Sequence, residues 1–129
     1  MASTITMYPL PDGGGKKIND SLYISPRKLI SIVSGTTAYS FTIEATAMVP
    51  KIILVYPALT GTDVTCVLSI ENANGDAIYT SSALAENATY IISPDNGVPL
   101  VGTNTVKLTC VKDPAGSGSA YVTLYLEGN

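Results

Sequence analysis

Apolar and polar residues alternate with a period of two along almost every extended stretch of this 129-residue chain. The clearest stretches are TAYSFTIEATAMV (37–49), DVTCVLSIE (63–71), TVKLTCV (105–111) and AYVTLYLE (120–127). Successive side chains of a β-strand point to opposite faces, so this pattern predicts strands with one face against a core. The many Val, Ile, Thr and Tyr residues in these stretches favour the same structure.

Glycine and proline residues separate these stretches at intervals of about 8–12 residues, which is typical of an all-β sandwich or barrel. Asn74-Gly75 predicts a tight hairpin turn, and Pro94–Gly97 predicts a β-turn. We therefore predict an antiparallel β-sandwich of jelly-roll or immunoglobulin-like type, with about nine strands and an extended N-terminal arm. The strands are expected near residues 21–25, 29–33, 37–48, 51–56, 63–71, 76–81, 88–92, 105–112 and 120–126, with a further extended stretch at 4–8.

The chain opens with MASTITMYPLPDGGGKK, whose prolines and consecutive glycines cannot pack into a core. We interpret residues 1–20 as a flexible, extended arm and residues 21–129 as a single sandwich domain. Gly13–Gly15 form a hinge with wide backbone freedom, on which the arm can add to a sheet edge or lie in a groove. The apolar side chains available for such a contact are Ile5, Met7 and Leu10. The alternative is a frayed terminus with no partner.

The run Ile52–Tyr56 is apolar on both faces of its expected strand, and LISIV (29–33) shows the same feature. One face of a two-layer sandwich normally meets water, so a partner is expected to cover Ile53 and Val55. The alternating tail places Tyr121 and Tyr125 on the face away from the core, where tyrosines can contact a protein partner or sugar rings. The alternative is that these tyrosines are simply exposed strand residues. The predicted partner-binding residues are Ile5, Met7, Leu10, Ile53, Val55, Tyr121 and Tyr125.

Charged residues make up only 13% of the chain, and the net charge is −3. Phosphate binding needs clustered Lys and Arg, so nucleic acid is not an expected partner. The apolar runs are too short for a membrane span, and the N-terminus lacks the pattern of a secretory signal. We therefore expect no membrane partner and synthesis in the cytoplasm without secretion. There Cys66 and Cys110 are expected to remain buried thiols, with a disulfide as the alternative.

Histidine is absent, which removes the usual general base and the commonest metal ligand. The acidic residues are dispersed in turn-like segments, and Asp63 is the nearest to a catalytic loop residue. The segment ENANGD (71–76) offers oxygen ligands suited to Ca²⁺, but a hairpin turn explains the same residues without a metal. We therefore predict that the protein is not an enzyme and has no catalytic residues, metal or cofactor.

The glycine-hinged arm, the Thr-, Ser- and Ala-rich strands and the ending SAYVTLYLEGN resemble the small β-sandwich or jelly-roll virion proteins of tailed bacteriophages. Within that group the chain is most similar to head decoration (cement) proteins. The resemblance implies a structural role in the virion, a homo-oligomer, of which a trimer is favoured, and binding to the major capsid protein or another virion protein. It implies synthesis in the host cytoplasm. The alternative function is a carbohydrate- or host-surface-binding module of a phage fibre or tail, or of an adhesin.

Overall fold

A computed structural model gives the structure of the chain and describes residues 6–7, 16–19, 22–25, 27–61 and 63–127. This part of the chain contains strands and no helix, so the predicted all-β class is confirmed. The strands are β1 (Thr6–Met7), β2 (Lys16–Asn19), β3 (Leu22–Ile24), β4 (Lys28–Ile32), β5 (Ala38–Tyr56), β6 (Cys66–Glu71), β7 (Ala77–Thr80), β8 (Ala88–Ile92), β9 (Val98–Leu100), β10 (Thr103–Cys110) and β11 (Gly118–Glu127). All their pairings are antiparallel.

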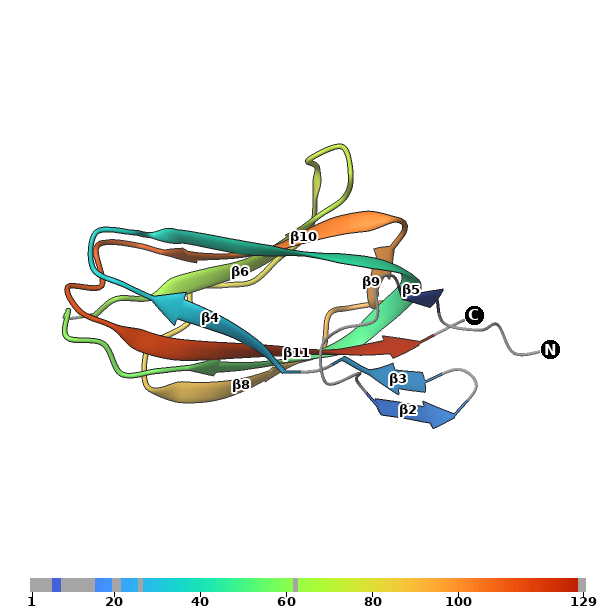
Figure 1. Cartoon of the computed structure of the whole chain (residues 1–129), viewed down its shortest axis with the longest axis horizontal. Helices are drawn as coiled ribbons and strands as arrows, with labels where there is room; N and C mark the ends of the chain where they lie inside the picture. Colours follow the sequence, from blue (N-terminus) through green and yellow to red (C-terminus); the bar gives the residue numbers. More distant parts are fainter. Residues whose placement is uncertain (1–5, 8–15, 20–21, 26, 62, 128–129) are drawn as a thin grey trace.

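Two sheets pack face to face and share β5 (Figure 1). In the sheet that we name the β10 sheet, the first half of β5 pairs with β10, which pairs with β6, which pairs with β7. In the β11 sheet, the second half of β5 lies between β11 on one side and β8 and β9 on the other. The far edge of β11 pairs with β4 and β3, and β3 pairs with β2.

The strand β5 is continuous over 19 residues, whereas the sequence analysis predicted two strands, 37–48 and 51–56, separated at Pro50. Pro50 is tolerated because it lies in a β-bulge: Tyr125 of β11 pairs with Lys51, but Glu127 pairs with Met48. A bulge interrupts the ladder, so the missing N–H of proline leaves no hydrogen bond unmade. Bulges also bend a strand, and here the bend carries β5 from one sheet to the other.

The sequence analysis missed two strands. In β9 (Val98–Leu100), Pro99 has no backbone N–H to donate and resembles a strand breaker in the sequence. Among the described residues, however, β9 pairs with β5 alone and is an edge strand, a place where proline is accepted. β2 (Lys16–Asn19) falls within the predicted arm, residues 1–20, and pairs with β3. Another segment of that range, β1, pairs with Thr46 and Ala45 of β5. The rest of residues 1–20, including the proposed hinge, lies outside the described residues.

The core lies between the sheets and is built from alternate residues of each strand, as the period of two predicts. One wall belongs to the β11 sheet, where β5 and the neighbouring β11 lie side by side. It consists of six residues that are at most 1% exposed: Ile52, Leu54, Tyr56, Val122, Leu124 and Leu126. The other wall comes from alternate residues of β6 and β10, namely Cys66, Leu68, Ile70, Val106, Leu108 and Cys110. The intervening residues of every strand therefore form the two outer surfaces of the sandwich.

Candidate functional site

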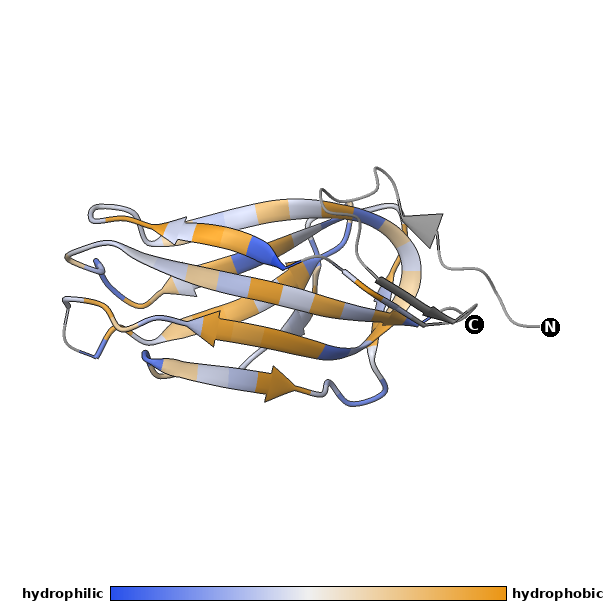
Figure 2. Ribbon diagram, turned by 60° about the horizontal axis from the view of Figure 1, so that its bottom comes forward, coloured by the Kyte–Doolittle hydropathy of each residue, from blue (hydrophilic) through white to orange (hydrophobic). Residues whose placement is uncertain are grey.

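The outer surface of the β11 sheet brings together apolar side chains from four strands. Strand register places Tyr121 of β11 opposite Leu29 of β4 on one side and Val55 of β5 on the other. One step along, Ile53 of β5 lies opposite Ile91 of β8. Figure 2 shows the four strands side by side in the order β4, β11, β5 and β8. We name this surface the outer apolar face and define it by Leu29, Ile53, Val55, Ile91, Tyr121 and Tyr125.

Solvent reaches every member of the outer apolar face. Leu29 is 50% exposed and Ile91 is 68% exposed, while Ile53 and Val55 are half-buried by their neighbours on the sheet. Two polar residues lie among them, since Thr123 of β11 is opposite Ile53 and Thr89 of β8 is opposite Val55. Exposed apolar side chains gathered on one surface can mark an interaction site. The face therefore has the composition of a protein-contact surface.

Two cations lie over the aromatic rings of this face. The guanidinium carbon of Arg27 is 3.6 Å from the ring centroid of Tyr121, and Lys51 Nζ is 5.2 Å from that of Tyr125. A cation over the ring face is attracted by the ring's negative π surface. Each contact occupies one face of a ring and gives an apolar surface a positive charge. A partner with carboxylates beside apolar side chains would complement it.

The opposite surface of the sandwich, on the β10 sheet, has a different composition. Its outward positions on β5, β10 and β6 are mostly hydroxyl-bearing or charged: Ser40, Thr42, Glu44, Thr103, Thr105, Lys107, Thr109, Ser69 and Glu71. Lys107 Nζ is 3.2 Å from Glu71 Oε2, and Thr103 Oγ1 donates to Glu44 Oε1 at 3.2 Å. These groups are well suited to contact with water. The two outer surfaces thus differ in composition: most of the large apolar side chains lie on the β11 sheet, and most of the hydroxyl-bearing and charged ones lie on the β10 sheet.

Four of the seven predicted partner-binding residues, Ile53, Val55, Tyr121 and Tyr125, meet on the outer apolar face. Met7 lies in β1 opposite Ala45, at a different part of β5. Ile5 and Leu10 lie outside the described residues. The prediction omitted two members of the face.

Leu29 and Ile91 are those omitted members. Leu29 belongs to the doubly apolar run LISIV, which carries the same signal as Ile52–Tyr56, although Leu29 is not among the predicted partner-binding residues. Ile91 sits in the short run Tyr90–Ile92, where three consecutive apolar residues were the available signal.

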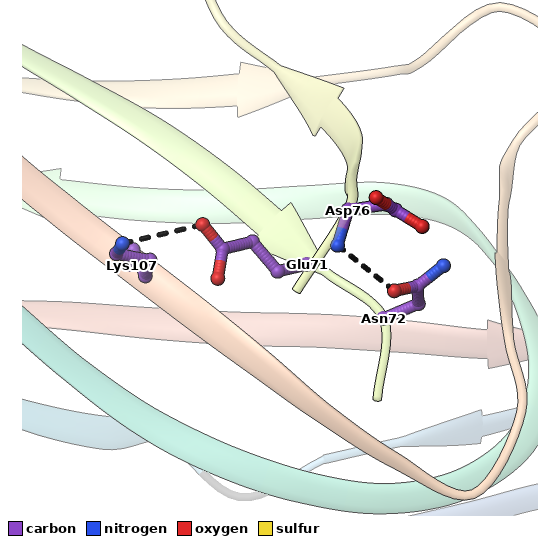
Figure 3. A network of polar contacts seen from close by, with 4 residues as sticks. All are labelled: Glu71, Asn72, Asp76 and Lys107. Atoms are coloured by element: carbon purple, nitrogen blue, oxygen red, sulfur yellow. Dashed lines mark hydrogen bonds and ion pairs between the residues drawn. The ribbon is translucent and has the colours of Figure 1, made fainter. Parts of the chain in front are cut away.

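The segment considered for calcium, residues 71–76, forms a hairpin turn (Figure 3). Asn72 Oδ1 accepts hydrogen bonds from the backbone N–H groups of Asn74 and Asp76, both at 3.0 Å, and Glu71 points to Lys107. The hairpin predicted at Asn74-Gly75 is present between β6 and β7. A two-residue turn would need positive φ at both of these residues, and here the turn is of another type. Only Gly75 has positive φ (84°), and its N–H donates to the carbonyl of Asn72 at 3.0 Å. Such a turn ends in a glycine bulge and satisfies the local oxygens without a cation.

Asp63, the nearest candidate for a catalytic loop residue, is an exposed turn residue with a φ of 54°. Its carbonyl accepts a hydrogen bond from the N–H of Thr65 at 3.0 Å. Within the described residues, no three His, Cys, Asp or Glu side chains are grouped so that they could hold a metal ion. The same part of the chain has no helix long and apolar enough to cross a membrane.

Cys66 and Cys110 are free thiols, buried opposite each other on β6 and β10. Tyr56 Oη lies 3.4 Å from Cys110 Sγ and donates a hydrogen bond to the carbonyl of Val64 at 2.8 Å. Burial raises the pKa of the Cys66 thiol to about 12, and the neighbouring Cys110 adds to this rise. Since only the thiolate is a good nucleophile, this environment makes Cys66 unreactive.

We expect the native protein to react with a thiol reagent such as Ellman's reagent far more slowly than the unfolded protein, because both thiols are buried. In denaturant, both cysteines should react at once. Rapid labelling under native conditions, or a mass two units below that of the reduced chain, would contradict this prediction.

No family model matches the sequence, and no curated protein matches it. Among solved structures, an arabinose-bound GH51 α-L-arabinofuranosidase is similar over 87% of this chain, at 13% identity and a TM-score of 0.43. The chain spans 22% of the length of that protein. The carbohydrate-binding module CBM36 in complex with calcium and xylotriose is similar over 98% of this chain and 99% of its own, at 15% identity and a TM-score of 0.40.

A chain from the structure of infectious bursal disease virus, Gx strain, is similar over 84% of this chain and 33% of its own, at 13% identity and a TM-score of 0.40. At such identities the similarities concern the fold alone and assign no activity. In fold, the chain is an all-β antiparallel sandwich.

Proposed function

We propose that the protein is a non-enzymatic structural protein of a virion, a capsid decoration protein that binds the capsid lattice through its outer apolar face. The observation that supports this most is the contrast between the two surfaces of the sandwich. One gathers six apolar or aromatic side chains with two cations over the rings, and the other carries mainly hydroxyl groups and paired charges. A subunit that lies on a particle needs this arrangement, with one surface against the lattice and the other toward solvent.

The contacts of this face define the lattice surface that fits it. Leu29 and Ile91 are at least half exposed at its two sides, on β4 and β8, and can enter apolar depressions of the partner. Arg27 and Lys51 add positive charge beside Tyr121 and Tyr125, so the partner surface should carry carboxylates near those depressions.

The second candidate function is carbohydrate binding, for which the two outward tyrosines are the specific observation. Aromatic rings bind sugars by offering an open ring face. Here the Arg27 guanidinium lies 3.6 Å from the centre of the Tyr121 ring and Lys51 lies over Tyr125. A sugar would have to use the other face of each ring or displace the cation. The geometry therefore favours a protein partner.

The double variant Leu29→Ser/Ile91→Ser is expected to weaken binding to capsids of the encoding phage that lack this protein, measured by co-sedimentation. Both side chains are at least half exposed, so the fold should be retained, with a stability change of about 0.5 kcal/mol or less per site. If the two residues are contact anchors, the dissociation constant should rise by roughly tenfold or more.

The matched control is Val101→Ser/Val111→Ser, which removes two apolar side chains of similar exposure, 69% and 67%, outside the face. This control should bind as the native chain does. Equal loss in both variants would show that general hydrophobicity drives binding, and no binding by the native chain would refute the proposal. Retention of the native chain on insoluble xylan or cellulose, lost in Tyr121→Ala, would favour the carbohydrate-binding alternative.

A further inference from the structure

Among the described residues, the first half of β5 is a strand edge whose backbone groups on one side have no partner strand. Two hydrogen bonds give the orientation of this half: Cys110 N–H donates to the Thr37 carbonyl, and Ala45 N–H donates to the Gly102 carbonyl. In an antiparallel ladder, the N–H and C=O of one residue point to the same side. The backbone N–H and C=O groups of the odd-numbered residues from 37 to 45 therefore bond to β10. Those of the even-numbered residues point away from β10.

The residues that point away are Ala38, Ser40, Thr42 and Glu44. Within the described part of the chain, β1 pairs with β5 only at residues 45–46, and no strand pairs with residues 38–44 on this side. Natural sheet edges are usually protected by proline, lysine, a bulge or a very short strand. The stretch AYSFTIE has no proline, no lysine and no bulge. As far as the described residues go, this stretch can pair with another strand.

The core is also incomplete along this edge. Tyr39, Phe41 and Ile43 point inward from β5 but are only partly buried, whereas Ile52 and Leu54 on the second half of the same strand are fully buried. The flexible side chain of Lys28 reaches over the Phe41 ring, with Nζ at 5.9 Å from its centroid. An added strand would therefore cover apolar side chains as well as pair backbone groups.

We propose that this edge binds the same edge of a second copy of the chain, forming a two-fold symmetric dimer in which the two β10 sheets become one continuous sheet. The antiparallel register centred on Phe41 pairs all four residues whose backbone N–H and C=O groups point away from β10. It places Ser40 opposite Thr42 of the second copy and Ala38 opposite Glu44, so no like charges face each other. Phe41 meets its own copy, and Tyr39 meets Ile43, which extends both cores across the junction.

This pairing closes on itself, as an isologous contact does, and gives a dimer, whereas the family resemblance favours a trimer. It uses a different surface from the outer apolar face. The edge and the face can therefore be tested separately, and failure of one proposal leaves the other standing.

The test is the solution mass of the full chain and of two variants at one position, by analytical ultracentrifugation over a concentration series. Thr42→Pro removes an N–H that points away from β10, so the bonds within the sheet remain. Thr42→Val keeps that N–H and the branched side-chain shape. The native chain and Thr42→Val should approach twice the 13.4 kDa chain mass as concentration rises. Thr42→Pro should raise the dimer dissociation constant by roughly tenfold or more, since it removes central pairing bonds.

Circular dichroism and thermal unfolding should show that Thr42→Pro is folded. If it is not, the double variant Ser40→Lys/Thr42→Lys, which brings like charges together across the junction, takes its place, with Thr105→Lys on the adjacent strand β10 as the control. A native chain that stays monomeric at every concentration would overturn the proposal. A trimer, or a dimer unchanged by both edge variants, would do the same.

Discussion

Replacing Leu54 by alanine should lower the free energy of unfolding by about 3 kcal/mol, because a fully buried leucine leaves a cavity that its surroundings fill only partly. Leu54 is 0% exposed, and its strand pairs with β11 at Val122 and with β8 at Tyr90. Because β5 lies between β11 and β8 at this point, its backbone has little room to move and close the cavity. Urea denaturation followed by circular dichroism measures the change.

The control is the adjacent residue, Val55, on the outer apolar face. Val55→Ala should cost about 1 kcal/mol or less, because the side chain is half-buried and its loss leaves no enclosed cavity. Comparable losses from the two variants would show that β5 does not separate a core side from a surface side at this point.

High pH is the second condition expected to destabilise the fold strongly. Cys66 has a pKa raised from 9.0 to about 12, mainly by burial, and burial together with the contact to Cys110 raises the pKa of Tyr56 well above its usual 10. The folded chain keeps these protons while the unfolded chain releases them. The stability from Cys66 is therefore complete below about pH 9 and is lost as the pH rises toward 12, by up to about 1.4 kcal/mol per pH unit.

Urea denaturation at a series of pH values from 7 to 11, on the native chain and on Cys66→Ala, measures this effect. The variant should be less stable at pH 7 because of its small cavity, but its stability should fall less steeply above pH 9. The difference in slope isolates the thiol, since the lysines and other tyrosines are common to both proteins. Parallel curves would show that Cys66 does not couple folding to proton release.

The period of two was sufficient to predict most of the fold, because the alternation in β5, β6, β10 and β11 records directly which side of each strand meets the core. What it could not predict is how a strand continues through a proline. Pro50 looks like an end of β5 because the signal of a bulge is spread over two strands, β5 and β11, that are far apart in sequence. The short β9 was hidden for a similar reason, since Pro99 is acceptable only at an edge, and edges are a property of the assembled sheet.

The outer apolar face was predictable in part for the same physical reason. Ile53 and Val55 break the alternation of β5, and Tyr121 and Tyr125 are large residues at outward positions, so each carries a local signal. Leu29 and Ile91 join them only through strand register, which pairs residues about ninety and forty positions apart in the chain. The cations over the tyrosine rings were not predictable, because the loop geometry that places Arg27 is not encoded in periodicity.

The passage of β5 through both sheets has a mechanical consequence. In a sandwich whose layers touch only through side chains, a force that pulls one layer sideways is resisted by apolar contacts alone, which slide easily. Here the same backbone runs in both layers, from Ala38 to Tyr56. A load applied to the outer apolar face passes along the covalent backbone of β5 into the opposite sheet. The two layers cannot slide apart unless β5 separates from its neighbouring strands on both sides of Pro50.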